Sequence, residues 1–278
     1  MDFQQNVEHD LITKYRTALW SPFMRAVSDY ELIKEGDKIA VCISGGKDSF
    51  LLAKCMQELA KHGKFPIQLE FIVMDPGYKE ENRQLIVSNA TKLGIPIHIF
   101  NSNIFETVNE ITKKPCYLCA RMRRGYLYRF AKELGCNKIA LGHHFDDVIE
   151  TILMSMLFGG EFKTMMPKLH SAHFEGMELI RPLYYVREKD IITWKNAYHL
   201  NFLNCACKFT DLVAKEEKSS KRLVTKQLIA SLKEQNPFVE NNIFKSVEKV
   251  NLNTLISYHK GNEMTHFLDH YDDDSNCS

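Results

Sequence analysis

The stretch Val41-Cys42-Ile43-Ser44-Gly45-Gly46-Lys47-Asp48-Ser49 decides the fold of this chain. The apolar run over residues 38–43 leads into it and predicts a buried strand. A helical pattern follows, in which one face carries the apolar residues Leu51, Leu52, Cys55, Met56 and Leu59. Residues 44–49 are therefore expected to form a tight loop between a strand and the N-terminus of a helix.

This loop has the chemistry of a phosphate-binding site. Gly45 and Gly46 let the backbone turn sharply and approach a ligand closely. The start of the helix offers free N–H groups and a partial positive charge, which suit an anion. Ser44 and Ser49 add hydroxyl groups, and Lys47 adds a cation. The alternative interpretation is an ordinary strand–helix turn that happens to contain two glycines.

The order Ser-Gly-Gly-x-Asp-Ser at residues 44–49 resembles the PP-loop signature of the ATP pyrophosphatase family. It is not a Walker loop, which needs a longer glycine spacing that ends in Gly-Lys-Ser/Thr. The resemblance implies an enzyme that activates a carbonyl or carboxyl oxygen with AMP and releases pyrophosphate. ATP is then a substrate, and Mg²⁺ accompanies ATP chemistry.

The composition is that of a soluble globular protein, with 278 residues, 45% hydrophobic and 26% charged. The net charge is only +1, so any nucleic-acid surface must be a local patch. We find no signal peptide and no apolar run that could cross a membrane, so the cytoplasm is the expected location. Eight cysteines in a cytoplasmic chain favour metal binding or redox chemistry over disulfides.

Strands alternate with helices after the loop, which predicts a parallel sheet with helices on both faces. The later strands are expected at residues 68–74, 95–100, 138–141 and 178–183, and the later helices at 80–93, 146–158 and 188–198. The predicted fold class is α/β with a five-stranded parallel sheet. Ligands of such sheets bind at the carboxyl ends of the strands.

The chain is expected to divide into four segments. Residues 1–34 form an N-terminal helical segment, bent or broken near Pro22. Residues 35–207 form the nucleotide-binding domain, which also holds the spaced cysteines. Residues 208–268 form a helical extension, and residues 269–278 form an acidic, flexible tail.

A second polar motif, Gly-His-His-Phe-Asp-Asp at residues 142–147, follows the fourth expected strand and opens a helix. Asp146 is placed to cap that helix through its side-chain oxygen. The residues expected to bind ATP are Ser44, Gly45, Gly46, Lys47, Asp48, Ser49, Asp75, Gly142, His143 and Asp147. Among them, Lys47, Asp48 and Asp147 are expected to be catalytic, and the two carboxylates are candidate oxygen ligands for Mg²⁺.

The cysteines suggest a metal site. Cys116 and Cys119 form a C-x-x-C, and Cys205 and Cys207 lie far downstream. The C-x-x-C alone fits half a zinc site, a redox pair or one arm of an iron–sulfur cluster. Only one cysteine of the C-x-C is an expected ligand, because both are awkward to place on one metal. Three thiolates favour a [4Fe–4S] cluster with one iron open to a non-protein ligand.

Residues 113–132 are rich in lysine and arginine, contain no acidic residue and have tyrosines interleaved. Such a strip is the footprint expected for an RNA backbone and unstacked bases. The alternative is a solvated helix face whose aromatic residues belong to the core. The candidate RNA-binding residues are Arg121, Arg123, Arg124, Arg129 and Arg181. Arg181, at the end of the fifth strand, could instead pair with an acidic neighbour.

Taken as a whole, this chain resembles the TtcA family of tRNA 2-thiocytidine synthetases. The resemblance rests on the loop, the C-x-x-C, the basic strip, residues 142–147 and Arg181-Pro182-Leu183. The resemblance covers residues 33–207. It implies a PP-loop fold, which is Rossmann-like and of the adenine nucleotide alpha hydrolase type. It also implies ATP, Mg²⁺, a [4Fe–4S] cluster on three cysteines and a homodimer. The family shows a second C-x-x-C where this chain has Cys205-Ala206-Cys207.

The function that follows from this resemblance is ATP-dependent thiolation of tRNA. A cytidine at position 32 of the anticodon loop is adenylated, and its 2-oxygen is replaced by sulfur delivered through the cluster. A cysteine desulfurase or free sulfide is the expected sulfur donor. The alternatives are a thiolase for another base or substrate, and a PP-loop ligase or amidotransferase that adenylates a carboxylate beside a structural metal site. A non-enzymatic RNA-binding regulator is a third.

Overall fold

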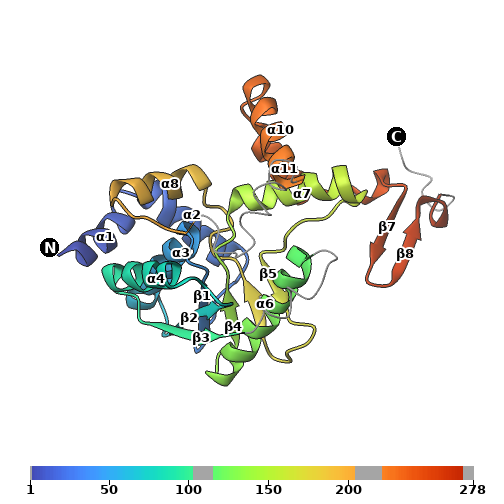
Figure 1. Cartoon of the computed structure of the whole chain (residues 1–278). Helices are drawn as coiled ribbons and strands as arrows, with labels where there is room; N and C mark the ends of the chain where they lie inside the picture. Colours follow the sequence, from blue (N-terminus) through green and yellow to red (C-terminus); the bar gives the residue numbers. More distant parts are fainter. Residues whose placement is uncertain (1, 103–114, 204–220, 272–278) are drawn as a thin grey trace.

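The computed structural model describes residues 2–102, 115–203 and 221–271, with only the backbone for residues 115–121. A six-stranded sheet lies at its centre in the order β3-β2-β1-β4-β6-β5 (Figure 1). Its strands are β1 (Lys38–Ile43), β2 (Gln68–Asp75), β3 (Ile97–Asn101), β4 (Lys138–Ala140), β5 (Lys168–His170) and β6 (Glu178–Ile180). All neighbours pair in parallel except β5, which runs antiparallel to β6.

The α/β fold class and all five expected strands are confirmed. The short antiparallel strand β5 is an addition that the sequence pattern did not indicate. The helices are α1 (Phe3–Ile12), α2 (Ser21–Asp29), α3 (Lys47–His62), α4 (Glu80–Leu93), α6 (Pro115–Glu133), α7 (Phe145–Gly159), α8 (Glu188–Ala197), α10 (Lys221–Gln235) and α11 (Val239–Ser246). The end of α4 is fixed by Gly94, whose φ of 66° is a left-handed conformation that glycine adopts without strain.

Helices cover both faces of the sheet, as predicted. Helices α1, α3, α4 and α8 share one large apolar cluster with β1 and β2, and α6 packs on the opposite face against β1, β2 and β4. Central strands bury both faces, so the apolar run of β1 is explained by its position between β2 and β4.

The N-terminal segment is part of the main core. Val7, Leu11, Leu19 and Phe23 are fully buried in the same cluster as β1. The expected break in this segment is a π-helical turn, η1 (Arg16–Trp20), directly before α2, in whose first turn Pro22 lies.

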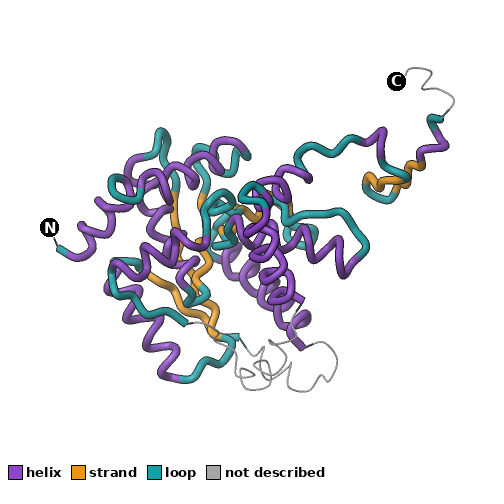
Figure 2. The backbone as a smooth tube through the Cα atoms, turned by 90° about the horizontal axis from the view of Figure 1, so that it is seen from above, coloured by secondary structure: helices purple, strands orange, loops and turns teal. Residues whose placement is uncertain are grey.

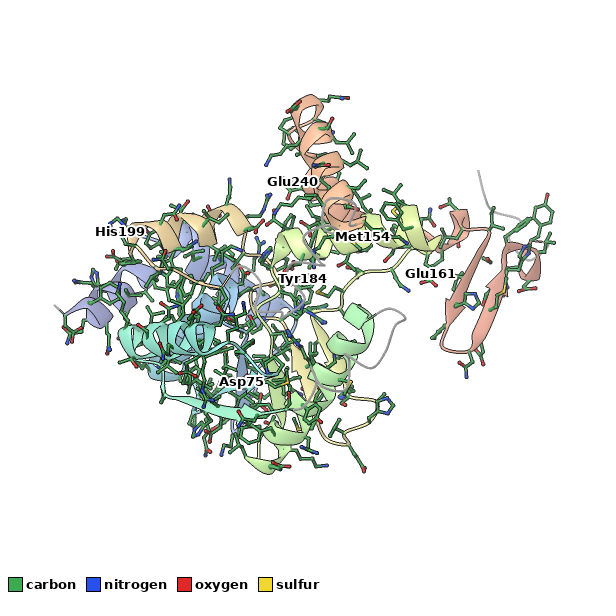
Figure 3. All side chains as sticks on the ribbon, in the orientation of Figure 1. Asp75, Met154, Glu161, Tyr184, His199 and Glu240 are labelled. Carbon is green, nitrogen blue, oxygen red and sulfur yellow. The ribbon has the colours of Figure 1, made fainter. Side chains whose placement is uncertain are left out.

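The C-terminal extension is described from residue 221 onward, where it is helical at first and then changes to strands. Helices α10 and α11 pack on α7, and Phe244 of α11 contacts Phe145 and Tyr184. Tyr184 and Glu240, labelled in Figure 3, mark where this helix pair meets the body. The helical pattern expected to residue 268 does not continue. Instead, β7 (Ser257–Lys260) and β8 (Glu263–His266) form an antiparallel hairpin that turns at Gly261. Two 3₁₀ turns flank this hairpin, η2 (Leu252–Thr254) before it and η3 (Phe267–Asp269) after it. Figure 2 shows this hairpin standing away from the body.

A buried ion-pair network ties the amino ends of the strands together. Lys138, at the start of β4, is 2% exposed. Its Nζ lies 2.9 Å from an Asp37 carboxylate oxygen and 3.0 Å from one of Glu178, and it donates to the Leu32 carbonyl. The buried cation is therefore fully paired, which is the condition under which its burial is tolerated.

The sheet topology fixes where a ligand binds. The chain order of the strands reverses between β1 and β4, and the crevice at the carboxyl ends of such a strand pair is the usual ligand site of open α/β sheets. The glycine-rich loop follows β1 and the Gly-His-His motif follows β4, so both open into this crevice. No helix in the described part of the chain is long and apolar enough to cross a membrane.

Candidate nucleotide site

The loop between β1 and α3 has the predicted strand–loop–helix geometry. Gly45 has a φ of 90°, a backbone conformation that favours glycine, and a Cβ there would also lie 2.8 Å from the Cδ1 atom of Leu203. The Ser49 hydroxyl donates to the Gly46 carbonyl at 2.8 Å and accepts from the Ser44 amide at 3.2 Å. These bonds fix the curvature of the loop around the first turn of α3.

Lys47 is held at the mouth of the loop by two carboxylates. Its Nζ lies 3.1 Å from Asp48 Oδ1 and 3.1 Å from Glu188 Oε1 on α8. Burial lowers the pKa of Lys47, but the charges of Asp48 and Glu188 outweigh this and raise it above the ordinary lysine value. Lys47 is therefore a fixed cation beside the free N–H groups of α3.

The motif that follows β4 is in direct contact with this loop. A Cβ on Gly142 would lie 3.0 Å from the carbonyl carbon of Asp48. Two residues after Gly142, His144 is the N-cap of α7. Its Nδ1 accepts a hydrogen bond from the Asp147 amide, and its own amide donates to Asp147 Oδ2 at 3.0 Å. This reciprocal cap holds the Asp147 carboxylate beside the loop.

The prediction that Asp146 caps α7 is wrong. His144 is the last extended residue, and Asp146 lies one residue inside the helix, past the position from which a side chain can cap it. Instead Asp146 accepts from the first amide of α8, Glu188 N, at 2.7 Å and pairs with Arg187 at 3.1 Å. It therefore joins the start of α7 to the start of α8.

Two cavities meet at Asp48 and Asp147. The first has about 270 Å³ and is lined by both serines of the loop and by apolar side chains at the strand ends and on α6, among them Met74, Leu127 and Leu141. The second has about 380 Å³ and is lined mainly by charged residues: Lys47, Glu150, Glu188, Arg222 and Lys226. One cavity thus suits a nucleoside, and the other suits a charged group.

His143 lines the first cavity, and its buried Nδ1 has no hydrogen-bond partner among the described residues. Burial, with the nearby Arg181 guanidinium as the next cause, lowers the pKa of His143 to about 4. The imidazole is therefore neutral at physiological pH and can exchange a hydrogen bond with a ligand.

Asp48 and Asp147 fit the predicted role of Mg²⁺ ligands. Asp48 Oδ1 is buried without a hydrogen-bond donor, although Lys47 lies near it. Burial raises the pKa of Asp147, but the charges of its neighbours, His144 and then Arg222, outweigh burial and bring that pKa below the ordinary aspartate value, so the carboxylate is ionised. Within the ranges that the structure describes, no cluster of three or more candidate ligands surrounds a metal position. Two carboxylates suffice for Mg²⁺ when substrate phosphates and water complete its shell.

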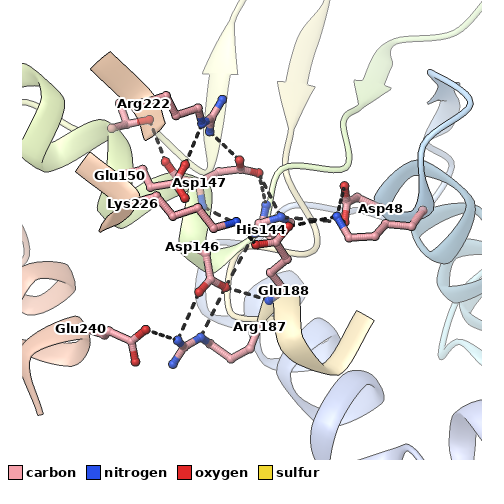
Figure 4. A network of polar contacts seen from close by, with 12 residues as sticks. Asp48, His144, Asp146, Asp147, Glu150, Arg187, Glu188, Arg222, Lys226 and Glu240 are labelled. Carbon is pink, nitrogen blue, oxygen red and sulfur yellow. Dashed lines mark hydrogen bonds and ion pairs between the residues drawn. The ribbon is translucent and has the colours of Figure 1, made fainter. Parts of the chain in front are cut away.

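Figure 4 shows a contribution that sequence reasoning missed. Arg222 of α10 donates to Asp147 at 2.5 Å and to Glu150 at 2.6 Å, and Lys226, one turn on, contacts Glu188 at 2.6 Å. In the sequence these two cations read as the solvated face of a polar helix, because nothing in their spacing indicates which helix they contact.

Two predicted site residues serve other contacts in this structure. The Asp75 carboxylate accepts from the amides of Gly77 and Tyr78, at 2.8 and 2.7 Å, and stabilises the turn after β2; Tyr78, not Asp75, lines the first cavity. Arg181 is 4% exposed and donates to the Met166 carbonyl. It lies beneath the site and does not reach the surface.

Helix α6 carries the basic strip. Arg123 lines the first cavity, and Arg124 lines a separate hollow of about 610 Å³ formed with the β5–β6 region. The Arg129 side chain is 65% exposed and lies over the Tyr126 ring. Cys116, Cys119 and Arg121 belong to the turns of α6 for which only the backbone is described, and Cys205 and Cys207 lie outside the described residues.

Comparison with known proteins places this site in a family. Residues 18–208 match the model of the PP-loop domain. The tRNA-cytidine(32) 2-sulfurtransferase of Alcanivorax borkumensis is 37% identical over 232 residues, which are 81% of this chain and 78% of that protein. The protein of the same name from Pelobacter propionicus is 35% identical over 84% of this chain and 85% of its own length.

A solved structure confirms the fold. The U34-tRNA thiolase NcsA from Methanococcus maripaludis, determined with its [4Fe-4S] cluster, superimposes with a TM-score of 0.63 at 22% identity, over 82% of this chain and 76% of that chain. The loop at the switch point of the sheet and the two cavities beside it thus define a PP-loop protein. The chain belongs to the PP-loop family, in the group of tRNA-cytidine(32) 2-sulfurtransferases.

Proposed function

We propose that this chain is an ATP-dependent tRNA thiolase that replaces the 2-oxygen of a cytidine, at position 32 of the anticodon loop, with sulfur. The observation that carries the proposal is an intact PP-loop, facing two adjoining cavities, in a chain whose relatives bear that enzymatic name. A PP-loop ligase for a carboxylate would leave the basic strip of α6 without a role.

The loop residues bind and orient ATP in this proposal. The amides at the start of α3 and the hydroxyl groups of Ser44 and Ser49 receive phosphate oxygens, as expected at a helix N-terminus. Lys47 offsets the negative charge that develops when the α-phosphate is attacked. Mg²⁺, held by Asp48 and Asp147, would neutralise further phosphate charge when bound.

The chemistry of the first step is transfer of AMP to the base. The C2 oxygen of the cytidine attacks the α-phosphate, an adenylated base forms, and pyrophosphate leaves. The neutral imidazole of His143, in the first cavity, hydrogen-bonds the nucleotide without adding charge. The base has to leave its stack to reach the loop, which an unpaired anticodon-loop nucleotide does at low cost.

The second step needs sulfur. Cys116, Cys119 and either Cys205 or Cys207 are a soft thiolate set that suits a [4Fe–4S] cluster. When bound, the cluster would supply sulfide to C2 of the adenylated base, and AMP leaves with the original 2-oxygen. The sulfur donor is a cysteine desulfurase or free sulfide. We further propose that the exposed arginines of α6 contact tRNA, that the protein works as a homodimer, and that it acts in the cytoplasm.

The test uses anaerobically reconstituted protein, ATP and two tRNA transcripts that differ only in cytidine or uridine at position 32. Nucleoside mass spectrometry should find 2-thiocytidine in the first transcript alone, with one AMP released per sulfur inserted. Thiolation of both transcripts, or of another base, would point to a different tRNA target. AMP release that needs a small carboxylate and no tRNA would support the ligase alternative.

Metal content tests the cluster separately. Cys119→Ala should lose iron and acid-labile sulfide and still bind ATP, because the cysteine and the loop lie on different segments. One zinc per chain and no sulfide in the unsubstituted protein would contradict the cluster and favour persulfide chemistry on a cysteine.

A further inference from the structure

The second cavity has an outer wall that the PP-loop domain does not supply. Arg222 and Lys226 reach it from α10, which follows the nucleotide-binding domain in the chain. Their side chains are 50% and 54% exposed, so each remains accessible from the cavity while it contacts a carboxylate. The described hydrogen bonds of Arg222 use Nε and Nη2 and leave Nη1 for another acceptor.

Anchoring α10 does not account for these two cations. The helix is already fixed by its buried residues Thr225 and Ile229, of which Ile229 packs in one apolar cluster with α7 and α11. Lys233, further along the same helix, pairs with Glu240 of α11 at 2.7 Å, and Glu240 in turn pairs with Arg187. Arg222 and Lys226 therefore have a second use open to them.

The charges of the second cavity match a metal-bound polyphosphate better than either ion alone. Cations and carboxylates alternate around it: Lys47, Arg222 and Lys226 face Asp48, Asp147, Glu150 and Glu188. The carboxylates would repel a bare phosphate, and the cations would repel a bare metal ion. A phosphate chain that carries a divalent cation satisfies both sets, because carboxylates bind the metal and cations bind the phosphate oxygens.

The position of the second cavity indicates which part of ATP it would bind. It adjoins the more apolar first cavity at Asp48 and Asp147, and Lys47 at the loop lies on its border. A nucleoside in the first cavity and an α-phosphate at the loop direct the rest of the triphosphate toward α10.

On the basis of the proposed function, we propose that Arg222 and Lys226 bind the β- and γ-phosphates of ATP and then the departing pyrophosphate. The C-terminal helix thus completes the leaving-group site. In this structure the carboxylates hold the two cations in place, and on binding the cations exchange a carboxylate for phosphate oxygens. Asp147 is thereby released toward the metal.

The test compares three ligands on the full-length protein, each with Mg²⁺ and measured by calorimetry: ATP, pyrophosphate and AMP. Arg222→Ala and Lys226→Ala should each weaken pyrophosphate and ATP about tenfold or more, as expected for the loss of a charge-assisted contact, and leave AMP affinity unchanged. Arg222→Lys should restore much of the pyrophosphate affinity. Lys233→Ala, on the same helix, should change none of the three.

Equal weakening of AMP and pyrophosphate would show that the two residues only position α10, and unchanged pyrophosphate affinity would overturn the proposal outright. The proposed function fails differently. Protein that binds ATP and pyrophosphate as described and yet thiolates no tRNA would remove the function and keep the phosphate site.

Discussion

Gly142 lies directly on the backbone of Asp48. A Cβ at Gly142 would approach the carbonyl carbon of Asp48 to 3.0 Å and the amide nitrogen of Ser49 to 3.1 Å, and both are main-chain atoms that cannot rotate away. The end of β4 therefore supports the PP-loop from below. The space between the two segments is set by the absence of a side chain.

Gly142→Ala should displace the loop. Overpacking against fixed atoms costs about 1–3 kcal/mol, and the strain falls on the segment that we propose binds phosphate. We expect ATP affinity to fall about tenfold, measured by calorimetry, with a small loss of thermal stability. Gly159→Ala is the control, because a Cβ there meets no atom within 4 Å. Unchanged ATP affinity in Gly142→Ala would show that the loop tolerates the shift.

Asp48→Asn should abolish most of the adenylation step. The substitution keeps the shape of the side chain and removes the negative charge that we propose binds Mg²⁺. Release of AMP in the presence of tRNA should fall about 100-fold, the scale seen when one electrostatic contact to a transition state is lost. The visible absorbance of the cluster should not change. Full AMP release would remove Asp48 from the catalytic set.

Protonation of His143 should make the protein less stable in mild acid. Its pKa of about 4 in the folded chain lies below the ordinary value of 6.5, so the unfolded chain takes up this proton first as the pH falls. Stability is therefore lost as the pH falls from about 6.5 to 4. His143→Gln should reduce that loss by an amount on the order of 1 kcal/mol between pH 7 and 5, measured by urea unfolding.

The exposed His173 provides the control for this experiment. His173→Gln should follow the wild-type dependence on pH. Parallel curves for His143→Gln and the wild type would mean that His143 takes up its proton equally easily in both states.

Lys138→Met should be strongly destabilising. The substitution leaves Asp37 and Glu178 without the cation that both contact inside the sheet. Breaking a buried pair in this way costs about 3–5 kcal/mol, which lowers the melting temperature by roughly 10 °C in a protein of this size. Lys168→Met is the matched control, because its Nζ lies 3.9 Å from the same Glu178 and the side chain is more exposed. A melting temperature equal to that of the control would contradict the structural role of Lys138.

The sequence was sufficient wherever the signal is local. Strand β1 begins and ends at the predicted residues because it is an unbroken apolar run before two glycines, and α4 ends where Gly94 adopts a left-handed conformation. The chemistry of the loop at residues 44–49 was also predictable from the sequence, because the strand, the turn and the start of the helix all lie in one short segment.

What the sequence did not reveal depends on contacts between distant segments. Strand β5 has only three residues and is stabilised by its pairing with β6, so its sequence shows no strand periodicity. Asp146 has the right residue type for a cap, but its partners, Arg187 and Glu188 N, lie about forty positions downstream. Arg222 likewise gains its place in the site only because α10 folds back onto α7.

In the segment from Gly142 to Asp147, five of the six positions each have a separate task. Gly142 supports the loop, His143 faces the first cavity, His144 caps α7, and Asp146 and Asp147 turn to α8 and to the loop. Each position can be substituted at the expense of one task. An inserted or deleted residue would shift all of these side chains at once. This stretch should therefore tolerate substitutions better than any change in its length.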